Sequence, residues 1–451
     1  MTGLMLRDSG DFLYQPISNQ IFSIVNTYVR KRDIKILKPR QKIVTLVGPR
    51  RAGKTYLMIG LAKRVFRKLG YKQVFYLNFE DERVFDVPKE YINAMDDFLQ
   101  NADLKKPVYM FLDEIQNLEN WEHVIARIHA RYPKVRIYLT GSNSATLSSD
   151  IATSLRGRTI TQYVPTLSFK EFIKFKRKQT ELKRSLKPVV LASKLFYEYL
   201  TFGGFPEVVL EKQTTMKTEI LREYLDVLLF RDVLERFSNR FINPKILRFL
   251  IERVAENITK PTSVNKIYNQ LKSLGYKVDK NGLYDYLDIL NNILFLQGVK
   301  KYNKASIKRE NSLKKYYFID VGYLQILKFI TTNDYGKLLE NLVFLELKKQ
   351  YDEIYYMQNG YECDFVAIKN HKITPVQVVY KLDIDDLNRE TNALYKVMRY
   401  TSTKKGILIF ATMDENVRVL LHESKQDGLY THLSAKFENI EFVNVLEWLL
   451  R

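Results

Sequence analysis

Residues Lys42–Met58 read KIVTLVGPRRAGKTYLM, and the other segments of the chain can be placed relative to them. Ile43–Val47 form an unbroken run of apolar and β-branched residues, which predicts a strand buried on both faces. Gly48–Thr55 follow with the spacing G-x-x-x-x-G-K-[ST], and apolar residues then recur at helical spacing. Strand, glycine loop and helix in this order predict a P-loop, which holds nucleotide phosphates at a helix N-terminus. A chance glycine turn beside a lysine is the alternative, and this order argues against it.

Each fixed position of the loop has a chemical role. Gly48 and Gly53 let the backbone curl so that its N–H groups point at phosphate oxygens, and Lys54 adds a positive charge at the outer phosphates. The Thr55 hydroxyl can ligate Mg²⁺. The predicted cofactors are ATP and Mg²⁺. The predicted nucleotide-binding residues of this loop are Gly48, Pro49, Arg50, Arg51, Ala52, Gly53, Lys54, Thr55 and Tyr56.

A second acidic motif follows the P-loop by about sixty residues. Val108–Leu112 are apolar and lead into Asp113 and Glu114, which is the Walker B pattern. The end of such a strand brings Asp113 toward the Mg²⁺ ion and Glu114 toward a water molecule for attack on the terminal phosphate. We therefore predict Asp113 as a metal ligand and Glu114 as the catalytic carboxylate.

Polar and basic residues after the next predicted strand, Val135–Thr140, complete the candidate catalytic set. Asn143 is a candidate sensor of the attacking water, and an ordinary Ser/Asn turn is the alternative. Arg156 and Arg158 are candidates for an arginine supplied to the site of a neighbouring subunit, with Arg158 preferred. This role predicts a homo-oligomer.

The composition bounds the class of protein and its partners. A single cysteine excludes an intramolecular disulfide and Cys-rich zinc sites, and the absence of an apolar run of about 18 residues predicts a soluble, cytoplasmic protein without membrane contact. The formal net charge is +21, of which +6 lies in Lys174–Lys187 and +10 in Arg240–Tyr316. Localised basic charge beside aromatic residues favours a nucleic-acid partner, and a lysine-rich solvated surface is the alternative.

Residues 243–319 show three helical patterns followed by two short apolar strands, which predicts a winged helix. The third helix carries Tyr284, Asp285, Tyr286 and Asp288 instead of arginines, so base readout is disfavoured. We expect phosphate contacts without sequence choice, or alternatively a winged helix that only packs against protein. The candidate nucleic-acid contacts are Lys174, Lys176, Arg177, Lys178, Lys300, Lys301, Lys304, Lys308 and Arg309; the basic wing also contains Lys314 and Lys315.

The chain resembles the archaeal and bacterial AAA+ P-loop ATPases that carry an α-helical lid, a winged helix and a C-terminal restriction-endonuclease-like domain. The motifs of this resemblance are the P-loop, Asp-Glu-Ile-Gln at 113–116, Thr-Gly-Ser-Asn at 140–143, Leu-Arg-Gly-Arg at 155–158, Ser-Phe-Lys-Glu-Phe at 168–172 and Gly-Gly-Phe-Pro-Glu at 203–207. The resemblance implies an α/β fold with four parts: an ATPase core at 1–172, a lid with a basic linker at 173–240, a winged helix at 241–334 and the last domain at 335–451. By analogy with related ATPases, Pro206 would contact adenine and Arg231 would act as a lid arginine.

In the last domain, Glu340 on a first helix and Asp364 on a second strand resemble the carboxylates of that nuclease fold. The third strand should supply an acid and then a lysine, but Gln377 and Val379 stand at these positions. Lys381 is a candidate displaced lysine on the same strand face. We expect this domain to have lost nuclease activity, because an amide is a weak Mg²⁺ ligand and valine cannot donate to a nucleophile.

Three functions follow from these patterns. The preferred one is an oligomeric ATPase that couples turnover to the binding or remodelling of nucleic acid. The alternative is a nucleotide-gated switch for protein interaction or signalling, and an ATP-dependent nuclease is the least favoured.

Overall fold

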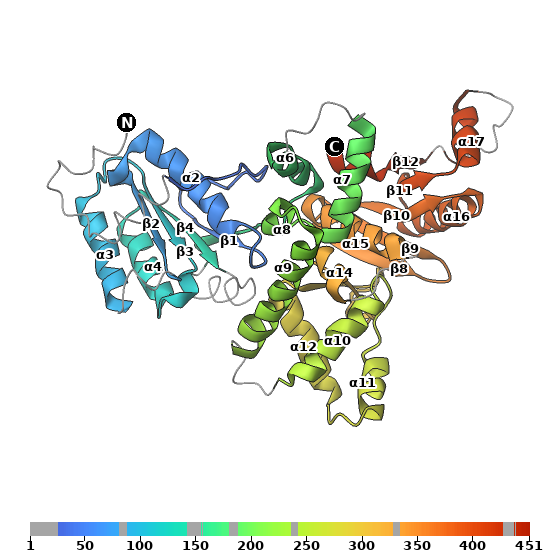
Figure 1. Ribbon diagram of the computed structural model, residues 1–451, viewed down its shortest axis with the longest axis horizontal. Coiled ribbons are helices and arrows are strands. Elements are labelled where there is room, and N and C mark those ends of the chain that lie inside the picture. Colours follow the sequence, from blue (N-terminus) through green and yellow to red (C-terminus); the bar gives the residue numbers. More distant parts are fainter. Residues whose placement is uncertain are drawn as a thin grey trace. The chain divides into compact units, whose positions relative to one another are not determined.

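The computed structural model describes residues 26–80, 88–141, 155, 157–179, 188–235, 242–327, 334–426, 437 and 439–451 (Figure 1). The chain forms two compact units, Met1–Pro165 and Thr166–Arg451. The predicted α/β class is confirmed, whereas the division into four domains stays a prediction. No helix of the described ranges is both long and apolar enough to cross a membrane.

The first unit is built around a five-stranded parallel sheet with the order β2-β3-β4-β1-β5. Ile43 and Val47 of β1 belong to the apolar core shared with α3 and α4, whereas Val44 and Leu46 belong to the core shared with α2. The sheet is therefore covered on both faces, as the unbroken apolar run of β1 predicted. The elements are β1 (Ile43–Val47), α2 (Lys54–Leu69), η1 (Tyr71–Gln73), β2 (Val74–Asn78), α3 (Pro88–Asn101), β3 (Val108–Asp113), η2 (Ile115–Asn117), α4 (Trp121–Arg131), β4 (Val135–Gly141) and β5 (Thr159–Tyr163).

The second unit begins with helices. Ser168 and Glu171 form a capping box at the start of α6: the Glu171 N–H donates to Ser168 Oγ (3.2 Å) and the Ser168 N–H to Glu171 Oε2 (3.1 Å). The Ser-Phe-Lys-Glu motif is thus explained by helix initiation. The helices are α6 (Phe169–Gln179), α7 (Pro188–Phe202), α8 (Pro206–Leu210), α9 (Thr214–Val227) and the π-helical segment η3 (Leu228–Glu235).

Three helices and a two-stranded antiparallel sheet follow, in the order predicted from the pattern. Asn243, Ser263 and Asp279 cap the three helices through their side chains. The segment comprises α10 (Pro244–Glu256), α11 (Val264–Ser273), α12 (Lys280–Asn292), β6 (Leu296–Val299), α13 (Ser306–Glu310), β7 (Lys315–Phe318) and α14 (Gly322–Leu327). We call β6, β7 and the residues between them the wing hairpin.

The last part of the chain contains a mixed five-stranded sheet with the order β12-β11-β10-β9-β8. Strands β8, β9 and β10 are antiparallel, and β10, β11 and β12 are parallel. Val376 of β10 packs in the core that contains α15, and Val379 in the core that contains α16, so the two helices cover opposite faces. The elements are α15 (Tyr335–Gln350), β8 (Glu353–Gln358), β9 (Glu362–Lys369), β10 (Lys372–Leu382), α16 (Ile384–Thr401), β11 (Gly406–Met413), α17 (Glu415–Gln426), β12 (Ile440–Asn444) and α19 (Val445–Leu450).

Candidate nucleotide-binding site

The loop between β1 and α2 has the backbone that the glycine spacing predicted. Gly53 has φ of 88°, a left-handed conformation that glycine adopts without a Cβ penalty, and Arg51 also lies at positive φ (63°). A Cβ on Gly48 would overlap the carbonyl of Val164, which follows β5. Gly48 is therefore needed for close packing inside the sheet as well as for access to phosphate.

Lys54 and Thr55 open helix α2. Lys54 is buried, and its ammonium donates to the carbonyls of Gly48 and Pro49 over 2.9 Å each, which holds the side chain back over the loop. The Thr55 hydroxyl lies close enough to the carboxylate of Asp113, at the end of β3, to lower the pKa of Asp113. The structure thus brings together the two oxygen ligands that the separate motifs predicted.

Asp113 lies at the centre of a buried polar network. Its carboxylate accepts hydrogen bonds from Thr140 Oγ1 and from the Tyr76 hydroxyl (3.1 Å). Burial raises the pKa of Asp113; the hydrogen bond from Thr140 opposes this rise, and the negative charge of Glu114 adds to it. Thr140 is the second-to-last residue of β4, the strand between β1 and β3 in the sheet. The predicted sensor strand therefore contacts the Walker B carboxylate through Thr140.

Glu114 is held in a strained position. Its backbone is left-handed (φ 52°, ψ 48°), a conformation that is uncommon outside glycine and that occurs often at functional sites. Its N–H donates to Thr140 Oγ1 (3.0 Å), and Gln116 Nε2 donates to Glu114 Oε2 (2.6 Å). The side chain and the backbone of the candidate base are thus both restrained.

Four residues of this site were missed in the sequence: Thr140, Tyr76, Gln116 and Arg32. Thr140 and Gln116 stand in the quoted Thr-Gly-Ser-Asn and Asp-Glu-Ile-Gln motifs, so a polar side chain at a strand end was a usable signal. Arg32 is buried and donates to the carbonyls of Ala52 (2.8 Å) and Pro165 (3.0 Å). These two hydrogen bonds connect the P-loop to the segment that follows β5. No local sequence pattern around Arg32 indicates this role.

Of the other predicted catalytic residues, Arg158 falls within the described residues. Asn143 and Arg156 lie outside the described residues. Arg158 is exposed, and its carbonyl accepts from the Ile43 N–H (2.9 Å) at the start of β1. Since the P-loop follows the other end of β1, Arg158 lies at the edge of the sheet away from its own P-loop.

Pro206 and Arg231 belong to the second unit, and their nucleotide-binding roles stay predictions. Pro206 is the first residue of α8, and Arg231 is an exposed residue of η3. The two glycines before Pro206 are explained by their contacts with Asp320. The Gly204 N–H donates to Asp320 Oδ2 (2.9 Å), and a Cβ on Gly203 (φ 73°) would overlap the Asp320 carboxylate.

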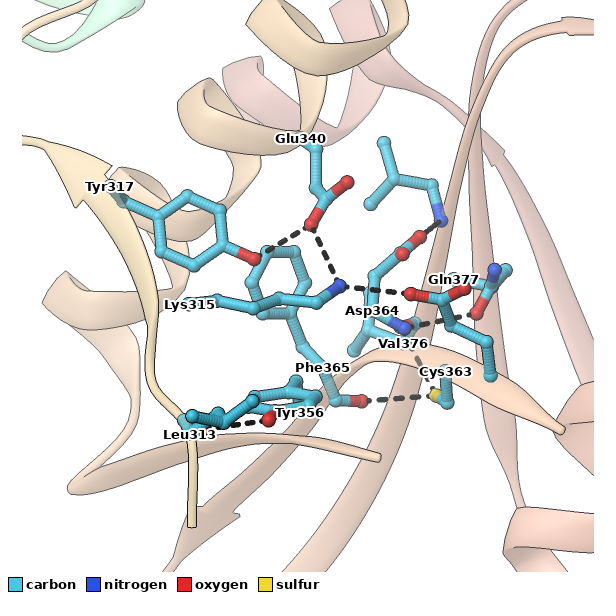
Figure 2. Close-up of polar contacts among 12 residues, drawn as sticks. Leu313, Lys315, Tyr317, Glu340, Tyr356, Cys363, Asp364, Phe365, Val376 and Gln377 are labelled. Carbon is cyan, nitrogen blue, oxygen red and sulfur yellow. Dashed lines mark hydrogen bonds and ion pairs between the residues drawn. The ribbon is translucent and has the colours of Figure 1, made fainter. Parts of the chain in front are cut away.

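The nuclease-like residues are only partly as expected (Figure 2). Asp364, Gln377 and Glu340 lie near one another, but Gln377 uses its carbonyl to accept from the Asp364 N–H (3.2 Å) and its amide to donate to Glu390 (2.6 Å). The candidate displaced lysine is wrong: Lys381 is exposed and pairs with Asp414 (3.3 Å). A lysine does reach these carboxylates, but it is Lys315 of the wing hairpin.

The basic candidates differ in exposure and in the contacts of their side chains. Lys174, Arg177 and Lys308 are exposed. Lys176 was expected to contact phosphate, but its side chain is 11% exposed and forms an ion pair with Glu198 (2.7 Å), because α6 packs against α7.

The remaining candidates of the wing hairpin contact neighbours in their own unit. Lys300 pairs with Glu310 (2.5 Å), Lys304 lies over the Tyr400 ring (5.0 Å) and Arg309 donates to the Asn303 carbonyl (2.8 Å). Lys301 is partly buried, and the side chain of Lys178 lies outside the described residues.

Comparison with known proteins agrees with this geometry. Residues 40–173 match a family described as an AAA domain, and residues 193–334 match a domain of unknown function. The chain is 35% identical over 381 residues to an uncharacterized protein of Methanocaldococcus jannaschii, covering 82% of each chain. It is 29% identical over 419 residues to an uncharacterized protein of Haemophilus influenzae, covering 91% of this chain and 94% of that one.

Among solved structures, the Walker-type ATPase of Pyrococcus abyssi aligns with 68% of this chain and all of its own, at 15% identity and a TM-score of 0.44. The AAA-domain match contains the P-loop, Asp113 and Glu114, and the archaeal match extends over most of both chains. This chain therefore belongs to the same family as the uncharacterized Methanocaldococcus jannaschii protein, and its first part contains an AAA domain.

Proposed function

We propose that this chain hydrolyses ATP with Mg²⁺ and works as an assembly of several subunits. The observation that carries the proposal is the closeness of the Thr55 hydroxyl, at the start of α2, to the buried Asp113 carboxylate at the end of β3. A hydroxyl and a carboxylate are the oxygen ligands by which proteins hold Mg²⁺ beside nucleotide phosphates, so the donor set fits this ion. When bound, Mg²⁺ supplies charge neutralisation on the phosphate oxygens.

The chain's own residues then have distinct roles. Lys54 and the N–H groups of the loop bind the phosphates, and Glu114 accepts a proton from the attacking water. Gln116 fixes the direction of the Glu114 carboxylate, and Thr140 fixes its backbone. Tyr76 and Thr140 donate to the charged form of Asp113 and so oppose the rise in its pKa that burial causes.

Hydrolysis is tested with two substitutions. Lys54→Ala should abolish binding of ATP, measured with a fluorescent analogue, because the ammonium that would lie at the outer phosphates is lost. Glu114→Gln should bind ATP with Mg²⁺ as tightly as the parent and release no phosphate. Equal turnover by Glu114→Gln and the parent would remove Glu114 from the mechanism.

Assembly is proposed from the position of Arg158, at the end of β1 away from the P-loop of its own chain. A neighbouring subunit is then the natural recipient of this arginine. Mixing Arg158→Ala chains with Lys54→Ala chains should restore part of the activity, since each supplies what the other lacks. A protein that is monomeric with ATP at the full catalytic rate would exclude this role.

Nucleic acid is the proposed partner, supported by the exposed bases Lys174, Arg177 and Lys308. The ATPase rate should be measured with single-stranded DNA, duplex DNA and RNA at two salt concentrations. Electrostatic binding to duplex DNA should weaken with a log–log salt slope of about −0.9 per phosphate contact. No binding at low salt, together with intact hydrolysis, would favour the nucleotide-gated protein switch instead.

A further inference from the structure

Strand β7 of the wing hairpin directs two polar side chains at one carboxylate of the last domain (Figure 2). Lys315 and Tyr317 are two residues apart and therefore share a face of the strand. The Tyr317 hydroxyl donates to Glu340 Oε1 (2.6 Å), and Lys315 Nζ lies 3.5 Å from the same oxygen. Glu340 belongs to α15, so one lysine of the predicted phosphate-binding wing contacts a nuclease-like carboxylate.

Lys315 is surrounded by acidic groups and has almost no exposed surface. Its side chain is 1% exposed, and its ammonium donates to Glu362 Oε1 (3.2 Å) as well as contacting Glu340. Burial would lower the pKa of Lys315, but the charges of Glu340, Asp364 and Glu362 outweigh it and raise the pKa. The ammonium therefore stays charged within this cluster, which we call the carboxylate cluster (Glu340, Glu362 and Asp364).

Further bonds fix the hairpin against the same domain. Asn341, buried on α15, accepts from the Phe318 N–H (2.8 Å) and donates to the Phe318 carbonyl (3.0 Å). Just before the start of β7, the Leu313 carbonyl accepts from the Tyr356 hydroxyl of β8 (2.7 Å). These contacts place Lys315 at one position, because both the backbone and the neighbouring side chains of β7 are held.

A divalent metal does not fit the cluster as it stands. Lys315 Nζ lies between the carboxylates, and both ends of the Gln377 amide are already hydrogen-bonded. The described residues contain no group of three or more His, Cys, Asp or Glu side chains arranged to hold a metal ion.

We propose that Lys315 is the resident cation of the carboxylate cluster: it supplies there the positive charge that a bound divalent metal would supply, and it locks the wing hairpin to the last domain. The wing hairpin and the last domain then move as one body. Metal-dependent chemistry is blocked by a residue supplied from another segment, in addition to the loss of the acid at Gln377. This inference does not depend on ATP hydrolysis.

The first test asks whether removing the lysine opens a metal site. Binding of Mn²⁺ without nucleotide is measured by electron paramagnetic resonance for the parent, Lys315→Ala and the control Lys348→Ala, which removes another largely buried lysine, bonded to Gln297. Lys315→Ala should bind one more Mn²⁺ per chain than the parent and the control. This additional site should bind Mn²⁺ about tenfold more tightly than any site that all three proteins share, a difference of about 1.4 kcal/mol in binding free energy. Adding Asp364→Ala should abolish the gain.

The second test remains decisive if Lys315→Ala folds poorly. Lys315→Met leaves buried carboxylates without their counter-ion and should lower the melting temperature. Lys315→Met combined with Glu340→Gln should recover part of that loss, because the uncompensated charge is gone. A parent protein that already binds Mn²⁺ through Asp364, a folded Lys315→Ala protein that gains no Mn²⁺, or a double variant that melts no higher than Lys315→Met would each overturn the proposal.

Discussion

Substitution of Thr140 by valine tests what the Thr140 hydroxyl contributes to the Walker B carboxylate, because the packing of the side chain in the sheet changes little. Valine keeps the β-branched shape of threonine and removes only the hydroxyl. That hydroxyl donates to the buried carboxylate of Asp113 and accepts from the Glu114 N–H (3.0 Å). The change therefore removes two hydrogen bonds and fills the same space.

The size of the effect follows from these two bonds. A hydrogen bond to a charged group contributes about 1.5–3 kcal/mol, and the neutral bond to the Glu114 N–H about 1 kcal/mol. Because the bond to Asp113 favours its ionised form, losing it should weaken Mg²⁺ binding by about 10- to 100-fold, at about 1.4 kcal/mol per tenfold.

The pH dependence of the ATPase rate should shift in a defined direction in Thr140→Val. Burial raises the pKa of Asp113, and the Thr140 hydrogen bond opposes the rise. Without this bond the pKa of Asp113 rises further, so a higher pH is needed to ionise the carboxylate that we propose as the Mg²⁺ ligand. The acidic limb of the rate profile should therefore move to higher pH in Thr140→Val.

The assay is the ATPase rate as a function of Mg²⁺ at fixed ATP, and the chain supplies a matched control. Thr45 lies on the adjacent strand β1 and is fully buried, and among the described residues its hydroxyl has no hydrogen-bond partner. Thr45→Val should leave the Mg²⁺ dependence unchanged, and Thr140→Ser should restore the parent value. Identical Mg²⁺ half-saturation in Thr140→Val and Thr45→Val would refute the reasoning.

Three further predictions concern the base, the glycine turn and the last domain. Glu114→Gln should reduce kcat by about 10²- to 10⁴-fold without a change in ATP affinity, measured by phosphate release and nucleotide binding; parental turnover would contradict the role of the base. Gly203→Ala should lower the melting temperature far more than Gly275→Ala. Both glycines have positive φ, but a new Cβ at 203 would overlap Asp320, whereas nothing lies within 4 Å of a Cβ at 275. Equal losses of melting temperature would show that backbone strain alone decides the effect. Incubation with Mn²⁺ or Mg²⁺, ATP and supercoiled, linear or branched DNA should give no cutting, and cleavage that is lost in Asp364→Ala would show this wrong.

Much of the nucleotide site could be predicted because its residues are adjacent in the chain or stand at strand ends. Gly48 to Thr55 form one loop, and Asp113 ends a strand parallel to β1, so both motifs meet at the same edge of the sheet. Thr140 as the contact of Asp113 could not be predicted with the same certainty. It requires knowing that β4 lies between β1 and β3, and strand order is set by packing across the whole sheet.

The basic wing shows the limit of reasoning from charge. Lys314 and Lys315 are neighbours in the same basic run, yet Lys315 is fully buried and Lys314 is not. Alternation along a strand places such neighbours on opposite faces, but Tyr316 and Phe318 are as apolar as Tyr317 and Ile319, so the pattern does not show which face is covered.

By itself the sequence determined the α/β class, the P-loop, the Walker B carboxylates and the order of helices and strands, because these depend on local spacing and on side-chain periodicity. Only the tertiary structure decided which lysine meets the nuclease-like carboxylates and which polar side chains restrain Asp113 and Glu114. The reason is physical: a buried charge is stable only beside partners that neutralise it, and those partners come from segments that are distant in sequence and meet only when the cores are packed.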